Sequence, residues 1–280
     1  MVRIAAIGDN DVDCYLSTGQ MYPGGNCLNV AVMAQRLGAD AAYIGAVADD
    51  AAGRLIQEVL AHEKVSSEHL RIEEGMTAYC VIDHKDSDRI FVTYDLGVSH
   101  FTPSQADIDY LAQFDAAHIG HTSGLDEYVS EFASKTRISY DFSIHASDAL
   151  IEKMAPFIWF ATVSAGDVAE DEAKDLMDKI QYHGVEWVMA TRGSEGAWLR
   201  HGEKTWAVKP VQVEVVDTLG AGDTMITRVL IGLLKGEDPL LALTEAAFAA
   251  AQTCTYYGAI GHGKVIDIPV SLADIKPVII

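Results

Sequence analysis

Short apolar runs and longer amphipathic segments alternate along most of the chain, which is the pattern of strands followed by helices. Apolar runs of strand length predict buried strands over residues 3–7, 42–47, 116–120, 137–142, 157–162 and 186–191. Helical periodicity predicts helices over residues 26–37, 49–60, 104–112, 127–134, 222–233 and 240–256. This alternation favours a parallel sheet with helices packed on its faces.

The period of the pattern changes between residues 77 and 94. Residues 77–83 and 89–94 are two β-rich runs separated by a polar stretch that contains Lys-Asp-Ser-Asp, and this arrangement predicts a hairpin. Consecutive strands with no helix between them do not fit the alternation in the rest of the chain. We therefore expect this hairpin to lie outside the main parallel sheet.

The composition limits the class of protein and the partners it can have. A chain of 280 residues with 49% hydrophobic content can bury a large core, and its length suits one α/β domain. The 41 acidic residues outnumber the 20 basic ones, so the formal charge of −21 opposes binding to nucleic acid or to an anionic membrane. The four cysteines form no CxxC pair, and neither a signal peptide nor a bilayer-length apolar run is evident. We predict a cytoplasmic protein.

A glycine-rich turn at residues 217–223, Asp-Thr-Leu-Gly-Ala-Gly-Asp, leads into the helix predicted from residue 222. The N-terminus of a helix presents unpaired N–H groups and the positive end of the helix dipole, so such a turn attracts phosphate. The carboxylate of Asp223 would repel an anion that only binds there. It suits a site in which it takes a proton from a hydroxyl that attacks a phosphoryl group. An aspartate that caps the helix is the structural alternative.

A second glycine pair, Gly24 and Gly25, precedes the helix predicted over residues 26–37. Paired glycines let a ligand approach the backbone closely, and Asn29 in the first turn offers both a donor and an acceptor. A capped helix start explains these residues equally well. Acidic residues at alternate positions follow the first predicted strand, where ligands of open α/β sheets bind, although their spacing alone slightly favours a solvated turn: Asp9, Asp11 and Asp13.

The two glycine-rich strings, at residues 24–31 and 217–223, resemble the signatures of the ribokinase-like (PfkB) family of carbohydrate kinases and stand in the family's order. The resemblance covers the whole chain. It implies a ribokinase-like three-layer α/β/α fold with a central, mostly parallel sheet. It also implies a single kinase domain over residues 1–280, with a small β-strand lid from about residues 14–22 and 77–94.

The same resemblance implies roles around the sugar and the transferred phosphoryl group. Asp223 would be the catalytic base, and the amides of Gly220, Ala221 and Gly222 would hold the phosphoryl oxygens. His121, at the end of a strand, is expected to be a structural histidine rather than a substrate contact. Residues near the first signature and on the lid hairpin would bind the sugar: Asp11, Asp13, Gly25, Asn29 and Arg89.

The resemblance extends to ATP and its metal ions, with departures. Most of the family has Asn-x-x-Glu where this chain has Ser164 and Asp167, so the carboxylate is one methylene shorter and the amide is lost. Asp167 would help to hold Mg²⁺ through water, and Asp217 would bind a monovalent cation, K⁺. Arg228 replaces a usual glycine and would either point to solvent or crowd the site. The ATP contacts would be Thr191, Gly193, Gly196, Ser164 and Asp167.

Within the family, the chain is most similar to the fructoselysine 6-kinase type, through Gly-Asp-Asn-Asp-Val-Asp at residues 8–13 and Asp-Ser-Asp-Arg-Ile-Phe at residues 86–91. This similarity implies an ATP-dependent kinase that phosphorylates the 6-hydroxyl of fructoselysine or another fructosamine. Another sugar kinase or an adenosine-type nucleoside kinase of the family, and a non-catalytic sugar-binding sensor, are the alternatives. Exposed lid edges invite pairing with another subunit, so we expect a homodimer joined through the lids.

Overall fold

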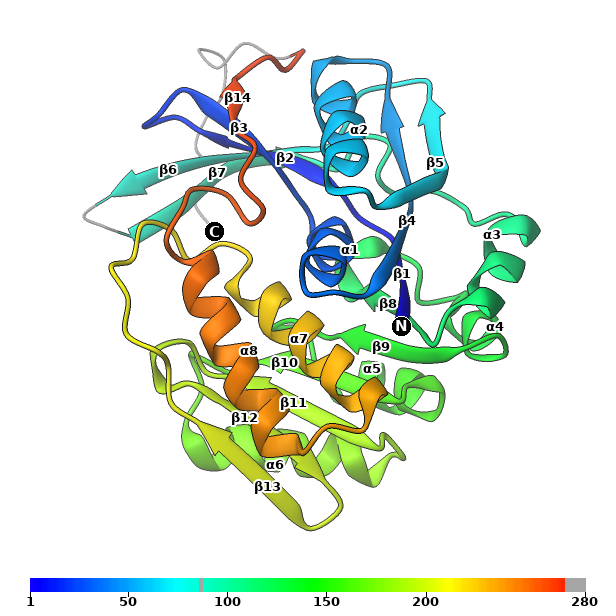
Figure 1. The fold of residues 1–280 in the computed structure, drawn as a ribbon, viewed down its shortest axis with the longest axis vertical. Coiled ribbons are helices and arrows are strands. Elements are labelled where there is room, and N and C mark those ends of the chain that lie inside the picture. The colour runs from blue at the N-terminus through cyan, green and yellow to red at the C-terminus, as the bar shows by residue number, and fades with distance from the viewer. Residues whose placement is uncertain (86–87, 270–280) are drawn as a thin grey trace.

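A nine-stranded sheet forms the centre of the molecule. The computed structural model describes residues 1–85 and 88–269, without the side chains of residues 84–91. The strand order is β13-β12-β11-β10-β9-β8-β1-β4-β5 (Figure 1). The strands are β1 (Arg3–Ile7), β4 (Asp40–Ala48), β5 (Ser66–Glu73), β8 (Ala116–Gly120), β9 (Arg137–Asp141), β10 (Phe160–Ser164), β11 (Trp187–Thr191), β12 (Ala197–His201) and β13 (Lys204–Val208).

Most neighbouring strands of this sheet run parallel. β1 pairs in parallel with β4 and β8, and parallel pairing continues from β8 through β9 and β10 to β11. At one edge, β12 pairs antiparallel with both β11 and β13. Because parallel strands end at the same edge of a sheet, the segments that follow β1, β8 and β9 meet there, which is where ligands of α/β sheets bind.

Helices cover both faces of the sheet, and the sheet divides the core into two parts. Side chains alternate along β1, so that Ile4 and Ala6 pack into one part of the core while Ala5 and Ile7 pack into the other. One face carries α1 (Asn26–Arg36), α2 (Ala51–Glu63), α7 (Ala221–Lys235) and α8 (Pro239–Thr253), as Figure 1 shows. The other carries α3 (Gln105–Tyr110), α4 (Val129–Ala133), α5 (Asp148–Met154) and α6 (Glu170–Tyr182). The predicted three-layer α/β/α fold is confirmed.

A second sheet of five strands lies beyond α1 and α7 in Figure 1, in the order β14-β3-β2-β6-β7. It contains the expected hairpin, β6–β7, and the segment near residues 14–22 contributes to β2 and β3. Pairing of two chains through this sheet remains a prediction. Arg89 belongs to β7, but its side chain lies outside the described part of the chain. The strands are β2 (Asp11–Tyr15), β3 (Gln20–Gly24), β6 (Tyr79–Lys85), β7 (Asp88–Asp95) and β14 (Lys264–Val265).

The acidic segment after β1 is a strand, so the solvated turn that its spacing favours is wrong. β2 pairs antiparallel with β3 and parallel with β6. Val12 and Cys14 pack into the core, while the intervening Asp13 is only 5% exposed. The alternation of acids and apolar residues is therefore that of a strand with one polar face. Local spacing does not reveal this strand, because its partner β6 lies more than 60 residues further along the chain.

The other predicted elements appear with shifted ends. β10 begins at Phe160, later than expected, because the preceding residues form the short 3₁₀ helix η3 (Ala155–Phe157). The hydrophobic pattern did not predict β5, α5 or α6. Further 3₁₀ helices are η1 (Leu111–Gln113), η2 (His121–Ser123) and η4 (Gly193–Glu195). None of the helices in the described ranges has the length and apolar character needed to cross a bilayer.

Asp50 joins the start of α2 to the segment before β6, so we predict that Asp50→Ala lowers the free energy of unfolding by about 2–3 kcal/mol. One carboxylate oxygen accepts from the Gly53 amide at 2.7 Å and from the Thr77 hydroxyl at 2.8 Å, while the other accepts from the Thr77 amide at 2.8 Å. Urea unfolding measures the loss.

The matched control for this change is Asp238→Ala. Asp238 also caps a helix, α8, but it is exposed and makes a single cap bond, to the Leu241 amide at 3.1 Å. Its loss should cost about 1 kcal/mol or less. Equal losses in the two variants would show that the bonds between Asp50 and Thr77 add nothing to the helix cap.

Candidate functional site

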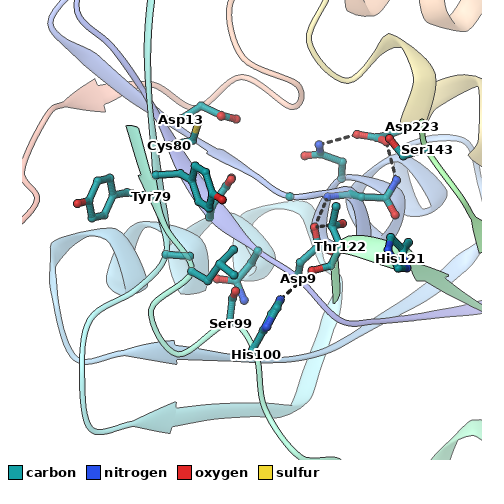
Figure 2. Close-up of a pocket in the computed structure, with 18 of the residues that line it drawn as sticks. Asp9, Asp13, Tyr79, Cys80, Ser99, His100, His121, Thr122, Ser143 and Asp223 are labelled. Carbon is teal, nitrogen blue, oxygen red and sulfur yellow. Dashed lines mark hydrogen bonds between the residues drawn. The ribbon is translucent and has the colours of Figure 1, made fainter. Parts of the chain in front are cut away.

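Two cavities meet at the N-terminus of α7. The first has a volume of about 650 Å³, and its lining includes Leu219 and Asp223 (Figure 2). The second has a volume of about 570 Å³, and its lining includes Thr218, Ala221 and Gly222. The glycine-rich turn is therefore the wall that both cavities share. A molecule in one cavity and a molecule in the other can approach each other across the first turn of this helix.

The conformation of the turn depends on Gly220. It is the N-cap of α7 and has φ of 76°, in the left-handed region that favours glycine. A Cβ atom at this position would lie 2.4 Å from the Cβ of Ala259, so the packing of the C-terminal segment also requires glycine. Ala221 and Gly222 of the first turn line the second cavity at the positive end of the helix dipole, and the Ala221 amide also donates to the Thr218 carbonyl at 3.3 Å.

Asp217 stabilises the same turn through its carboxylate. Its carboxylate accepts from the Leu219 amide at 3.0 Å, from the Gly258 amide at 3.0 Å and from the hydroxyl of Tyr15 on β2. The side chain is 7% exposed and lines neither cavity. Asp217 therefore connects the small sheet, the turn and the segment after α8. Its expected role as a cation ligand stays a prediction.

Asp223 is held by two asparagines of α1. Its Oδ2 accepts from the Nδ2 of Asn29 at 2.7 Å, and its Oδ1 accepts from the Nδ2 of Asn26 at 2.8 Å; Figure 2 shows these bonds as dashed lines. The same Asn26 nitrogen donates to Oδ2 of Asp141 at 3.2 Å. The end of β9 and the starts of α1 and α7 thus converge on one carboxylate.

A buried histidine fixes the orientation of the Asn26 amide. His118 on β8 lies with Nε2 2.9 Å from the Oδ1 of Asn26 and Nδ1 2.9 Å from the hydroxyl of Ser139. Both His118 and Ser139 are 0% exposed, and burial lowers the pKa of His118 to about 4. The ring is therefore neutral near pH 7, donates from Nε2 to Asn26 and accepts at Nδ1 from Ser139. The Asn26 NH₂ group is left to face the two carboxylates.

Burial raises the pKa of Asp223 to about 7. The hydrogen bonds from Asn29 and Asn26 act in the opposite direction, and the charges of Asp141 and Asp9 raise the pKa further. Asp11 has a pKa of about 7 for the same kinds of reason, namely burial and the charges of Asp9 and Asp223. A carboxyl group with a pKa near neutral can both lose and accept a proton under physiological conditions.

The start of α1 is built by backbone and carboxylate together. Gly25, the N-cap, has φ of 100°, and a Cβ atom there would lie 2.5 Å from the Cα of Asn10. Glycine offers no side chain to cap the helix, and Asp9 replaces it: its Oδ2 accepts from the Asn26 amide at 3.0 Å. This cap sets the position of Asn26 and Asn29 on the first turn of the helix.

The structure gathers most of the predicted site residues around the two cavities. The predicted sugar contacts with described side chains line the first cavity: Asp11, Asp13, Gly25 and Asn29. Of the predicted ATP contacts, the following line the second cavity: Ser164, Thr191, Gly193 and Gly196. Asp167 is exposed on the segment after β10 and lines neither cavity. Met225 and small residues of α8, such as Ala247 and Ala251, add an apolar wall to the second cavity.

Two expectations about single residues need revision. His121 has protein partners, the Asp126 carboxylate at 3.2 Å and the Tyr140 hydroxyl at 3.1 Å, as expected of a structural histidine, but it also lines the first cavity. Arg228 neither crowds the site nor points freely to solvent. It forms an ion pair with Glu237 at 2.8 Å, and its side chain is 15% exposed.

The sequence did not single out Asp141, His118 or Ser139. These residues stand on β8 and β9, far along the chain from the two glycine-rich signatures, and nothing in their immediate neighbours marks them. The available signal was their position at or near the C-terminal ends of buried parallel strands, where side chains reach the ligand edge of the sheet. Asp9 was predicted only as part of an acidic turn, not as the residue that caps α1.

Comparisons with known proteins agree on one family. The profile of the "pfkB family carbohydrate kinase" matches residues 2–264. The chain is 33% identical to fructosamine kinase FrlD of Bacillus subtilis, with 94% of each chain covered. It is 34% identical to fructoselysine 6-kinase of Escherichia coli, with 92% of this chain and 100% of the relative covered.

Solved structures share the fold. Ribokinase of Arabidopsis thaliana, complexed with ribose and ATP, superposes with a TM-score of 0.82 at 21% identity, covering 93% of this chain and 95% of the other. Fructokinase of Vibrio cholerae, with fructose, ADP and calcium bound, gives a TM-score of 0.76 at 23% identity, with 93% and 95% covered. At these identities the likeness shows the fold.

The raised pKa of Asp223 predicts an effect on stability. The pKa is about 7 in the folded protein against a reference of 3.8. Between these values the folded state binds more protons than the unfolded state, so the protein loses stability as the pH rises through this window. Asp223→Asn removes this loss. We expect the variant to melt above the parent at pH 8, and the difference to vanish near pH 4, where the parent side chain is also neutral.

Differential scanning calorimetry of both proteins between pH 4 and pH 8 measures this difference. Asparagine is a suitable stand-in for the protonated aspartic acid, because each has a single carbonyl oxygen to accept from the side-chain amides of Asn26 and Asn29. Melting temperatures that differ by a constant amount across the whole range would show that ionisation of Asp223 is not costly in this site.

Proposed function

Because the chain belongs to the pfkB family of carbohydrate kinases, we propose that it transfers the γ-phosphoryl group of ATP to a hydroxyl of a sugar held in the first cavity. One observation carries the proposal: the two cavities meet at the first turn of α7, with Asp223 on one side and the Ala221–Gly222 backbone on the other. A hydroxyl beside Asp223 and a phosphate beside that backbone would face each other across a single helical turn.

Asp223 is the general base in this reaction. The substrate hydroxyl gives its proton to the carboxylate as the oxygen attacks phosphorus. The amides of Gly220, Ala221 and Gly222 hold the transferred phosphoryl oxygens at the positive end of the α7 dipole. A base with a pKa of about 7 is matched to this work, since it is partly ionised at neutral pH and holds the proton once taken.

The donated hydrogen bonds keep this base in one place. Asn29 and Asn26 hold the two oxygens of Asp223, and His118 holds Asn26. The carboxylate therefore needs little reorganisation when the hydroxyl arrives. The lid formed by the small sheet would close over the sugar and exclude water that could otherwise take the phosphoryl group.

The substrate we favour is a fructosamine such as fructoselysine, phosphorylated at its 6-hydroxyl. The support is the similarity to relatives named fructosamine kinase and fructoselysine 6-kinase over almost the whole chain. The first cavity suits a polyhydroxy ligand, because Asp11, Asp13 and Asn29 offer acceptors and donors for paired hydroxyls.

A metal ion would be bound mainly by the phosphates of the nucleotide. The lining of the second cavity, within the described residues, offers hydroxyl and carbonyl oxygens from residues such as Ser164 and Thr191 but no carboxylate. Mg²⁺ commonly binds through substrate phosphates and water with one or two carboxylates, so the ATP phosphates would supply most of its ligands here, with Asp167 acting through water. When bound, Mg²⁺ neutralises charge on the phosphates. Asp217 accepts hydrogen bonds from protein groups, and K⁺ binding at this residue stays a prediction.

A coupled assay of ADP release over fructoselysine, fructose, ribose and adenosine tests the proposed substrate. Fructoselysine should give the highest kcat/KM. If adenosine or ribose were the best substrate, the proposed substrate would be wrong, while the assignment as a kinase of this family would stand. No sugar-dependent ADP release from any of the four would overturn the assignment of the first cavity to a sugar of this class.

We predict that Asp223→Asn lowers turnover by roughly 10²–10⁴-fold, as expected when a general base is lost, while ATP still binds. Single-turnover kinetics with the true sugar measures the chemical step. Turnover within a few-fold of the parent, with chemistry limiting the rate, would contradict the role of Asp223.

The matched control for this variant is Asp107→Asn. Asp107 is also a buried aspartate at the third position of a helix, α3, and it is held by Ser104, His69 and Arg71, away from both cavities. Its replacement should lower stability and leave turnover nearly unchanged. A similar loss of turnover in both variants would mean that structural damage, not the loss of a base, explains the Asp223 result.

We predict that Asp13→Ala raises the KM for the sugar by roughly 10- to 100-fold and leaves the KM for ATP nearly unchanged. Asp13 is 5% exposed and lines only the first cavity. Loss of a buried, charged hydrogen-bond partner of a hydroxyl costs about 1.5–3 kcal/mol. Steady-state kinetics with each substrate varied in turn measures the two constants. An unchanged KM for the sugar would remove Asp13 from the binding site.

A further inference from the structure

A third hollow adjoins the first cavity, which we call the sugar cavity after its proposed ligand. It has a volume of about 740 Å³ and lies where the segment after β9 enters α5. Two side chains, His121 and His145, belong to the walls of both hollows. The two spaces therefore adjoin at these two side chains, on the side of the first cavity toward which the rest of a ligand longer than a sugar could extend. We call this hollow the tail groove.

The tail groove differs in chemistry from the sugar cavity. The sugar cavity is lined by several carboxylates, among them Asp11, Asp13 and Asp223, whereas the lining of the tail groove contains no carboxylate. Its walls are apolar at Ile144 and Leu150, and Ile144 is 72% exposed. An apolar side chain so exposed beside a ligand cavity has surface to offer to an aliphatic group.

The tail groove also contains a cation, Lys153 on α5. Within residues 1–85 and 88–269, no ion pair or side-chain hydrogen bond of Lys153 is found, whereas Lys174 and Lys179 on α6 are each paired with an acid. The 41 acidic residues outnumber the 20 basic ones, so side chains that could pair with a ligand's carboxylate are the minority of the charged groups. The unpaired ammonium group of Lys153 is therefore available to a ligand's carboxylate in a hollow whose lining contains no carboxylate.

We propose that the tail groove binds the part of a sugar–amine substrate that lies beyond the sugar, an aliphatic chain ending in a carboxylate. The chain packs on Ile144 and Leu150, and the carboxylate pairs with Lys153. The proposal rests on the proposed function, because it extends the sugar site to the amino-acid portion of a fructosamine. It assigns the selection of amino-acid adducts over plain sugars to residues of β9–α5, outside the catalytic turn.

Two substrates that differ only in charge test the pairing: the fructose adduct at the side-chain amine of lysine, and the same adduct of lysine amide. Lys153→Met removes the charge and keeps the length of the side chain. It should raise the KM for the acid about 2- to 5-fold, the size expected of an exposed ion pair, and Lys153→Glu should raise it further. Neither change should alter kcat, nor the KM for the amide by more than a small factor.

Two further variants complete the design. Lys174→Met makes the same change of net charge on α6, outside the groove, and should leave the KM for both substrates as in the parent. Ile144→Ser should raise the KM for the acid and the amide alike, since both carry the aliphatic chain, and leave the KM for fructose unchanged.

The outcomes separate the two proposals. If the parent enzyme phosphorylates both adducts and the Lys153 variants change the KM for acid and amide equally, or not at all, the tail groove is not the binding site of the carboxylate, while the proposed function stands. If the parent phosphorylates neither adduct, the proposed substrate class is wrong, and the tail groove proposal falls with it. A rise specific to the acid supports the assignment of Lys153.

Discussion

The burial of one carboxylate, that of Asp223, is the constraint on which the rest of the site depends. A buried acid is costly when ionised, so burial raises the pKa of Asp223 to about 7, and the charges of Asp141 and Asp9 act in the same direction. The fold keeps it usable by aiming two amide donors at it from the first turn of α1, Asn26 and Asn29. Stronger donors would lower the pKa and weaken the base, whereas weaker ones would leave a carboxyl group that stays protonated. The two neutral amides give an intermediate result, which is what proton transfer near neutral pH requires.

The same constraint explains why acids that would otherwise repel one another stand close together. The carboxylate of Asp9 accepts from the Asn26 amide at the start of α1 at 3.0 Å and from the Ser123 hydroxyl at 2.7 Å. Asp141 accepts from the Thr162 hydroxyl at 2.7 Å and from the Ser143 amide at 3.0 Å. Each acid is therefore part of the local structure of a helix or strand end. The acids then act on Asp223 through charge, and the direction of the effect is to make it a better proton acceptor.

The sequence predicts those parts of the site whose residues are close together along the chain. The glycine-rich turn and Asp223 are contiguous in sequence and were found, as was Asn29, because a turn that feeds a helix is a local pattern. The strand β2 was not predicted from spacing, since its pairing with β6 is non-local. His118 was missed for the same reason: it lies 92 positions from Asn26, and the pairing of its strand β8 with β1 is non-local. Asp167 was expected near the ATP phosphates by resemblance, but it lies on an exposed segment and lines neither cavity.

The register of the first turn of α7 matters as much as the identity of its side chains. Successive residues of a helix point about 100° apart, so a shift of one position would turn the carboxylate away from the first cavity. Gly220 starts the helix in a left-handed conformation against Ala259, and Asp217 ties the residues just before it to Gly258 and to Tyr15 of the small sheet. The position of the Asp223 carboxylate is thus fixed by the C-terminal segment and by the small sheet together. A motion of the small sheet over the sugar would act directly on the turn that separates the two cavities, because Tyr15 and Asp217 share a hydrogen bond.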